Sequence, residues 1–133
     1  MPYIPVVAAV IAVAGILFAF KSNIDKIKQE PDKLEKYQTK LFIGAAISEA
    51  IPIILIIYGF SAMETVALLT ELYVPMTIVI ALIVFSMIYI FLQTRLDVDE
   101  ELKPAIRSFG IIGLGLVNAI PIISLVMLFL MVP

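Results

Sequence analysis

The sequence predicts an all-α integral membrane protein with four transmembrane helices, arranged as two tandem helical hairpins. Hydrophobic residues make up 62% of the 133 residues and charged residues make up 15%. A soluble domain is roughly half apolar and about a quarter charged. The charges are clustered and leave four apolar runs of about 20 residues, the length of helix that crosses a hydrocarbon core of roughly 30 Å. Helices are expected because lipid offers the backbone no hydrogen-bond partners.

The four apolar runs predict the elements in order. The first hairpin, residues 1–63, contains helices at about 3–22 and 41–60, and the second, residues 64–133, contains helices at about 72–94 and 108–131. The first run is not typical of a cleaved signal peptide, because basic residues follow it instead of preceding it. Small residues along the first helix predict close helix packing, within the monomer or in an oligomer. They are Ala8, Ala12, Gly15 and Ala19.

The basic residues predict the orientation. All nine Lys and Arg residues lie in the connections inside the two hairpins, and the connection between the hairpins has none but carries Glu64 and Glu71. Under the positive-inside rule the two basic loops are cytoplasmic and both termini lie outside. We therefore expect a multi-pass membrane protein, with a bacterial plasma membrane as its predicted location.

Two segments share one pattern. Gly44 to Ile54 reads GAAISEAIPII and Gly113 to Ile123 reads GLGLVNAIPII, so an offset of 69 residues gives five consecutive identities that include a proline within a helix. This indicates a parallel internal duplication, in which the functional site often lies at the repeat interface. The alternative is that apolar helices of low complexity look alike.

Glu49 is the candidate functional residue. It lies about nine residues into the second apolar run, deep in the hydrocarbon, where insertion of a charged residue costs about 2.5–3.5 kcal/mol. Burial favours the neutral form of a carboxyl group, which then gives up its proton when water or a cation approaches. Proton binding is therefore the default hypothesis, and a structural hydrogen bond is the alternative.

Pro52 and Ser48 are the predicted supporting residues. Proline has no N–H group, so the carbonyl of Ser48 loses its partner within the helix. A free carbonyl beside Glu49 is able to accept the proton of the neutral acid or to help hold a cation. Alternatively, Pro52 serves only to kink the helix, as prolines commonly do in membranes.

Asn118 occupies the register of Glu49 in the second half. An amide forms hydrogen bonds but does not ionise. If Glu49 carries a proton, Asn118 marks a second site that has kept its polarity and lost the ability to bind and release a proton. Pro121 frees the carbonyl of Val117 in the same way as Pro52 frees that of Ser48. The alternative is that Asn118 holds two helices together by a hydrogen bond.

The composition argues against other functions. The chain has no cysteine and no histidine, so it offers no thiolate, no imidazole catalysis and no histidine metal site. We expect no enzymatic activity, no metal, no cofactor and, with a net charge of −2, no nucleic-acid partner. The acidic run of Asp97, Asp99, Glu100 and Glu101 does not have the spacing of a calcium loop and is interpreted as a solvated face.

The first hairpin resembles subunit c of rotary ATP synthases, the proteolipid whose ring turns as protons cross the membrane. In that family the second helix reads Phe-Ile-Gly, three or four small or apolar residues, then Glu-Ala-Leu-Pro-Ile-Ile. This chain has Phe42-Ile43-Gly44 and then Glu49-Ala50-Ile51-Pro52-Ile53-Ile54. The polar loop is similar too, with Pro31 and Gln38-Thr39 in register before Phe42. The duplicated form with one surviving carboxylate resembles the vacuolar-type proteolipid.

The resemblance implies a role for each of these segments. Glu49 would be the proton-binding residue. Its carboxyl group would be neutral when it faces lipid, and it would lose its proton at a stator subunit that supplies an arginine. The loop of Lys28, Gln29, Glu30 and Pro31 would face the central stalk, and further copies of the chain would form a homo-oligomeric ring in lipid with other membrane subunits. Sodium-binding members carry a glutamine and a Ser or Thr at positions that correspond to Ile16 and Ala50, so protons are implied.

Departures from the family leave two alternatives open. The glycine repeat of helix 1 is reduced to Ala12, Ala14 and Gly15, and the Arg-Gln-Pro of the loop reads Gln29-Glu30-Pro31. One alternative is a non-rotary c-like scaffold, assembly or accessory protein, whose basic first loop binds a partner or anionic lipid. The other is a small proton-coupled exporter, although the chain has no tryptophan for an aromatic cage.

Overall fold

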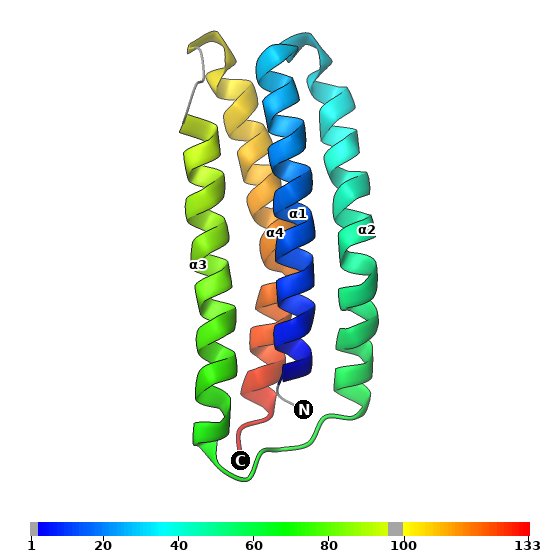
Figure 1. The fold of residues 1–133 in the computed structure, drawn as a ribbon, viewed down its shortest axis with the longest axis vertical. Coiled ribbons are helices and arrows are strands. Elements are labelled where there is room, and N and C mark those ends of the chain that lie inside the picture. Colours follow the sequence, from blue (N-terminus) through cyan, green and yellow to red (C-terminus); the bar gives the residue numbers. More distant parts are fainter. Residues whose placement is uncertain (1–2, 96–99) are drawn as a thin grey trace.

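The computed structural model describes residues 3–95 and 100–133 as a bundle of four long helices (Figure 1). These are α1 (Tyr3–Gln29), α2 (Leu34–Ser61), α3 (Tyr73–Arg95) and α4 (Lys103–Leu130). Three short 3-10 turns precede α2, α3 and α4, namely η1 (Pro31–Lys33), η2 (Leu69–Leu72) and η3 (Glu100–Leu102). All four long helices have the length and apolar composition of membrane spans, so the predicted all-helical membrane fold is confirmed.

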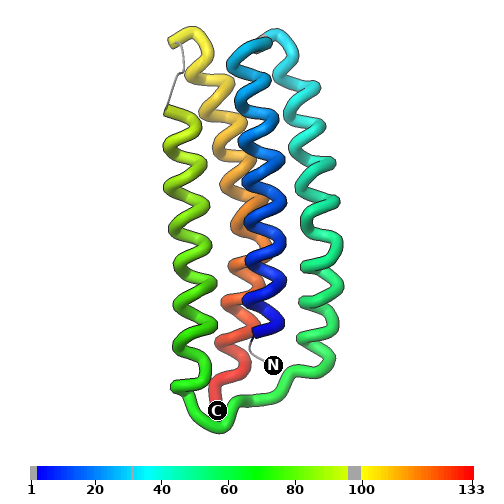
Figure 2. The backbone as a smooth tube through the Cα atoms, viewed as in Figure 1, coloured from blue at the N-terminus to red at the C-terminus, as the bar shows by residue number. Residues whose placement is uncertain are grey.

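The helices run alternately up and down, so that α1–α2 and α3–α4 are antiparallel hairpins (Figure 2). α1 is the central helix and packs against each of the other three, and it also contacts α4 extensively across the two hairpins. α2 and α3 lie on opposite sides of the α1–α4 pair (Figure 1). α1 is accordingly the most buried of the four spans, whereas most of the span-length part of α2 and α3 faces outward.

The helices are longer than the predicted apolar runs at the end where each hairpin turns. α1 continues seven residues beyond the predicted end at 22, to Gln29, and α2 begins at Leu34 instead of 41. α4 begins at Lys103 instead of 108. The prediction followed hydropathy, but lysine, glutamate and glutamine are good helix formers and continue a helix out of the membrane. The predicted first loop is therefore a short turn between α1 and α2, and most of its lysines are helical.

Close contacts at small residues hold the helices together. Ala8 and Ala12 are fully buried in α1, and Gly44 of α2 lies against Ala19, which confirms the predicted small-residue stripe. In α4, the buried Gly113 lies under the ring of Phe20, and that ring stacks on Phe109 at 5.1 Å between centroids. An aromatic side chain of α1 therefore packs into a notch on α4 and joins the two hairpins.

Hydrogen bonds tie the hairpins to each other at both ends of the bundle. Near the hairpin turns, Lys21 Nζ donates to Gln93 Oε1 and Lys28 Nζ donates to the Gln93 carbonyl, both at 2.8 Å. At the other end, the buried Ser124 hydroxyl donates to the Pro5 carbonyl at 2.9 Å. Both ends are therefore held by specific bonds in addition to apolar packing.

Candidate proton-binding site

Glu49 lies near the midpoint of α2, as its sixteenth residue of 28. Residues three and four positions apart share a helix face. Glu49 is four residues after Ala45 and three before Pro52, and both of these are buried against the bundle. Its carboxyl group is therefore held on the inward-facing side of a membrane span, half-buried, with exposed apolar residues on the rest of the helix surface.

One carboxyl oxygen of Glu49 is buried without a hydrogen bond. Oε1 has no donor or acceptor partner among residues 3–95 and 100–133, and no other described side-chain nitrogen or oxygen atom is both buried and unpartnered. Hence the Ser48 carbonyl, which Pro52 was expected to make available, is not bonded to Oε1. A buried carboxyl oxygen without a partner is energetically costly, because a polar atom in an apolar environment needs a compensating hydrogen bond.

Ser48 sets the distance between α1 and α2 beside Glu49. Its hydroxyl and Cβ lie directly on Gly15 of α1, where even an added Cβ would overlap them. Because Gly15 has no side chain, the two helices approach closely at the level of the carboxyl group. Ser48 is thus a packing residue of the site, and Gly15 is a supporting residue that the sequence indicated only as part of a small-residue stripe.

Asn118 lies in α4 and is hydrogen-bonded on both sides of its amide. Its Nδ2 donates to the Leu114 carbonyl at 3.0 Å, and its Oδ1 accepts from the Ser86 hydroxyl of α3 at 3.2 Å. Ser86 is fully buried and shares its proton with the Ile83 carbonyl at 2.8 Å. The polar group of the second half is therefore partnered, unlike Glu49, and it links α3 to α4. Ser86 was not predicted as a site residue, although it is a small polar residue in a bulky apolar helix.

Removing this interhelical bond is expected to have a modest effect. A double-mutant cycle of Ser86→Ala and Asn118→Ala should give a coupling energy of about 0.6 kcal/mol and no more than about 2 kcal/mol, the range for hydrogen bonds between membrane helices. The measurement is unfolding of the purified protein in mixed detergent micelles. Additive single effects would show that the two side chains do not interact.

Pro121 and the described part of the acidic run named from the sequence belong to other elements than Glu49. Pro121 is buried within α4, as Pro52 is within α2. Glu100 and Glu101 are exposed, as expected for a solvated face, whereas Asp97 and Asp99 lie outside the described residues. The described part of the chain contains no group of three or more His, Cys, Asp or Glu side chains arranged to hold a metal ion.

A curated relative shares a hairpin-length segment with this chain. The ATP synthase subunit c of Alkalihalobacillus alcalophilus is 38% identical over 61 residues, which make up 44% of this chain and 86% of the relative. The chain belongs to the ATP synthase subunit c family. No family model matches the chain, and no solved structure matches it. The membership therefore rests on the shared segment, and the four helices are consistent with a duplicated member of the family.

In this subunit c-family chain, the segment from Lys28 to Pro31 that was predicted as a loop comprises the last two residues of α1, Glu30 and the first residue of η1. Lys28 is half-buried and bonded to α3, while Gln29 and Glu30 are exposed. Glu30 accepts a hydrogen bond from the Tyr37 hydroxyl at 2.8 Å and pairs with Lys33 at 3.4 Å. Pro31 begins η1, and its side chain lies outside the described part. Gln29 and Glu30 are thus the members of this segment that are open to a partner.

The loop is expected to become less stable in acid. The Tyr37 hydroxyl and, next, Lys33 bind the ionised Glu30 and hold its pKa below the usual range of a glutamate. Because the folded-state pKa is the lower one, this contact contributes fully above the unfolded-state pKa and is lost as the pH falls through the folded-state pKa. NMR titration of Glu30 should show a higher pKa in Tyr37→Phe than in the wild type. An unchanged titration would contradict the Tyr37–Glu30 contact in solution.

Proposed function

We propose that this protein is a proton-binding, c-like rotor subunit that contributes to proton translocation across the membrane, with Glu49 as the group that binds and releases the proton. The observation that carries this proposal is the buried, unpartnered Oε1 of Glu49 at the middle of a membrane span. A group in that position is stable as the neutral acid and becomes ionised when a polar partner reaches it.

Each cycle of binding and release needs a change in the surroundings of Glu49. Toward lipid, the carboxyl group stays neutral and carries its proton. Opposite a stator subunit, a basic group of that partner and access to water favour the carboxylate, so the proton leaves. Protons are favoured over sodium because Ile16 is buried and apolar, and the side chain of Ala50 has no oxygen that could bind a cation.

The second hairpin is proposed to be a duplicate that lost the titrating group. The segment shared with the relative accounts for 44% of this chain, so the chain has room for a second hairpin of similar length. Its Asn118 is engaged by Ser86 and does not ionise. The chain then resembles a vacuolar-type proteolipid, in which residues 1–63 form the hairpin with the proton site and residues 64–133 form the hairpin without it. A ring of such chains has fewer carboxylates per helix than a ring of single hairpins, so it moves fewer protons per turn.

The orientation and partners follow from the charges. All nine basic residues lie in the half of the bundle that holds the two hairpin turns. These turns are therefore proposed to be cytoplasmic and both termini to lie outside the cell. The proposed membrane is a bacterial plasma membrane. Copies of this chain would form the ring, a stator subunit would contact α2, and the central stalk would meet Gln29 and Glu30. The chain itself is proposed to be non-catalytic and to need no cofactor.

Assembly tests this proposal against its alternatives. Native mass spectrometry of the protein, extracted in mild detergent, should show a ring whose mass is a multiple of the 14.7 kDa monomer. A monomer or dimer whose Glu49 does not react with a hydrophobic carbodiimide would favour a non-rotary scaffold or accessory protein. Proton-driven drug efflux that is lost in Glu49→Gln would favour a small exporter. Either result would overturn the rotor proposal.

A further inference from the structure

We propose that the groove between α3 and α4 at the basic end of the bundle binds one anionic phospholipid. Arg95, Lys103 and Arg107 would hold its phosphate, and the apolar part of the groove would hold an acyl chain. This proposal concerns the second hairpin and does not depend on proton binding by Glu49.

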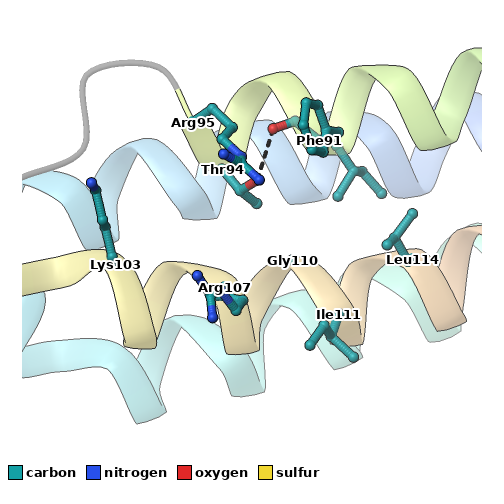
Figure 3. A pocket seen from close by; sticks show the side chains of 9 residues that line it. Phe91, Thr94, Arg95, Lys103, Arg107, Gly110, Ile111 and Leu114 are labelled. Atoms are coloured by element: carbon teal, nitrogen blue, oxygen red, sulfur yellow. Dashed lines mark hydrogen bonds between the residues drawn. The ribbon is translucent and has the colours of Figure 1, made fainter. Parts of the chain in front are cut away.

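The groove is a cavity of about 490 Å³ with cations at one end and apolar side chains along its length (Figure 3). Arg95 comes from the last turn of α3, while Lys103 and Arg107 come from the first two turns of α4. Toward the middle of the membrane, the same groove is lined by Ile90, Ile111 and Leu114. Two helices of the same hairpin therefore bring three positive charges to the mouth of an apolar cavity.

The arginines of this groove are available to an anion. The Arg95 guanidinium lies 4.6 Å from the centroid of the Phe91 ring, and within residues 3–95 and 100–133 no carboxylate forms an ion pair with Arg95 or Arg107. Lys103 pairs with the exposed Glu100 at 3.9 Å, a long contact that contributes little in water. The hydroxyl of Thr94 already donates its proton to the Phe91 carbonyl at 2.7 Å, so it does not have that proton to offer to a phosphate.

The cations at the ends of the spans and the apolar part of the groove together favour a lipid as the occupant. Arg95 and Arg107 lie at the ends of membrane spans, where the headgroups of the bilayer are expected, and guanidinium groups bind phosphate in a bidentate manner. Basic pockets between transmembrane helices on the cytoplasmic side are typical sites for anionic headgroups. A free phosphate would satisfy the cations but would leave the Ile90–Ile111–Leu114 part of the groove empty, whereas a phospholipid matches both parts.

The experiment compares two doubly substituted proteins that each lose two positive charges at the same end of the bundle. Arg95→Gln/Arg107→Gln removes charges in the groove, and Lys33→Gln/Lys36→Gln removes exposed charges at the α1–α2 turn. The full-length protein is titrated in detergent with dioleoyl phosphatidylglycerol or dioleoyl phosphatidylcholine, and native mass spectrometry counts the bound lipid. We expect binding of the anionic lipid to weaken at least tenfold in the groove variant and less than threefold in the control variant.

Two further variants separate the charged and apolar parts of the groove. Arg95→Lys/Arg107→Lys retains the charges but loses the bidentate geometry, so its lipid affinity should lie between that of the wild type and that of Arg95→Gln/Arg107→Gln. Ile111→Trp should weaken lipid binding with all charges present, because it fills the apolar part from an exposed position. Equal losses in the groove and control variants, equal binding of the two lipids, or displacement of the lipid by millimolar inorganic phosphate would each overturn the proposal.

Discussion

Replacing Glu49 with glutamine is expected to abolish labelling of the protein by a hydrophobic carbodiimide. Such a reagent partitions into the membrane and reacts with neutral carboxyl groups, and Glu49 is the only acidic residue within the apolar part of the four spans. The wild-type chain should gain one adduct, seen by mass spectrometry of the intact protein, and Glu49→Gln should gain none. Because glutamine has nearly the same shape, the fold should be unaffected by the change.

A matched control for this result is Glu64→Gln. Glu64 is exposed in the connection between the hairpins, outside the apolar part of the spans, so its replacement should leave the single adduct in place. Labelling should fall as the pH rises, because the reagent needs the protonated acid. An adduct that persists in Glu49→Gln, or that forms at Glu64, would contradict the assignment of the reactive group.

Replacing Gly113 with leucine is expected to destabilise the bundle by about 1–3 kcal/mol, the usual cost of inserting atoms into a well-packed interior. A Cβ at this position would lie 2.6 Å from ring carbons of Phe20 and 3.6 Å from Ile90. Phe20 also stacks on Phe109, so the ring has little room to move. The substitution should therefore separate α1 from α4 and weaken the association of the two hairpins.

Gly115 provides the control because it lies on the same helix with open space around it. Apart from the neighbouring residues and backbone of α4 itself, no atom of the described residues comes within 4 Å of a Cβ added there, so Gly115→Leu should change the free energy of unfolding little. The measurement is unfolding of both variants in mixed micelles, followed by circular dichroism and by cross-linking between the hairpins. Equal stability of the two variants would show that the Phe20–Gly113 contact does not hold the hairpins together.

The membrane fold could be predicted from the sequence because its main cause is composition. Each apolar run is long enough to span a bilayer, and lipid leaves helices as the available backbone solution, so all four helices were found within a few residues at their outer ends. The inner ends of α1, α2 and α4 were wrong by five to seven residues, since hydropathy marks the edge of the membrane and not the end of a helix, whereas α3 ends within one residue of its prediction. Lys26, Lys28 and Lys36 are hydrophilic and helical at once.

The candidate site was only partly predictable. Glu49 stood out because a carboxyl group is costly inside a membrane, but its lack of a partner depends on which residues the other helices place beside it. The pairing of Asn118 with Ser86 joins positions 32 residues apart, and no local pattern indicates such a contact. The small-residue stripe predicted close packing, and the structure adds the particular partner of each residue, such as Ser48 for Gly15.

Infrared spectroscopy of the protein in lipid bilayers would test most directly whether Glu49 is a neutral acid within the membrane. The wild type at neutral pH should show the carbonyl band of a protonated carboxyl group, slow to shift in D2O because the group is shielded from water. Glu49→Gln should lack this band. If the wild type instead shows only carboxylate bands at neutral pH, or if the neutral band survives in Glu49→Gln, then Glu49 is not the proton-binding group of this protein.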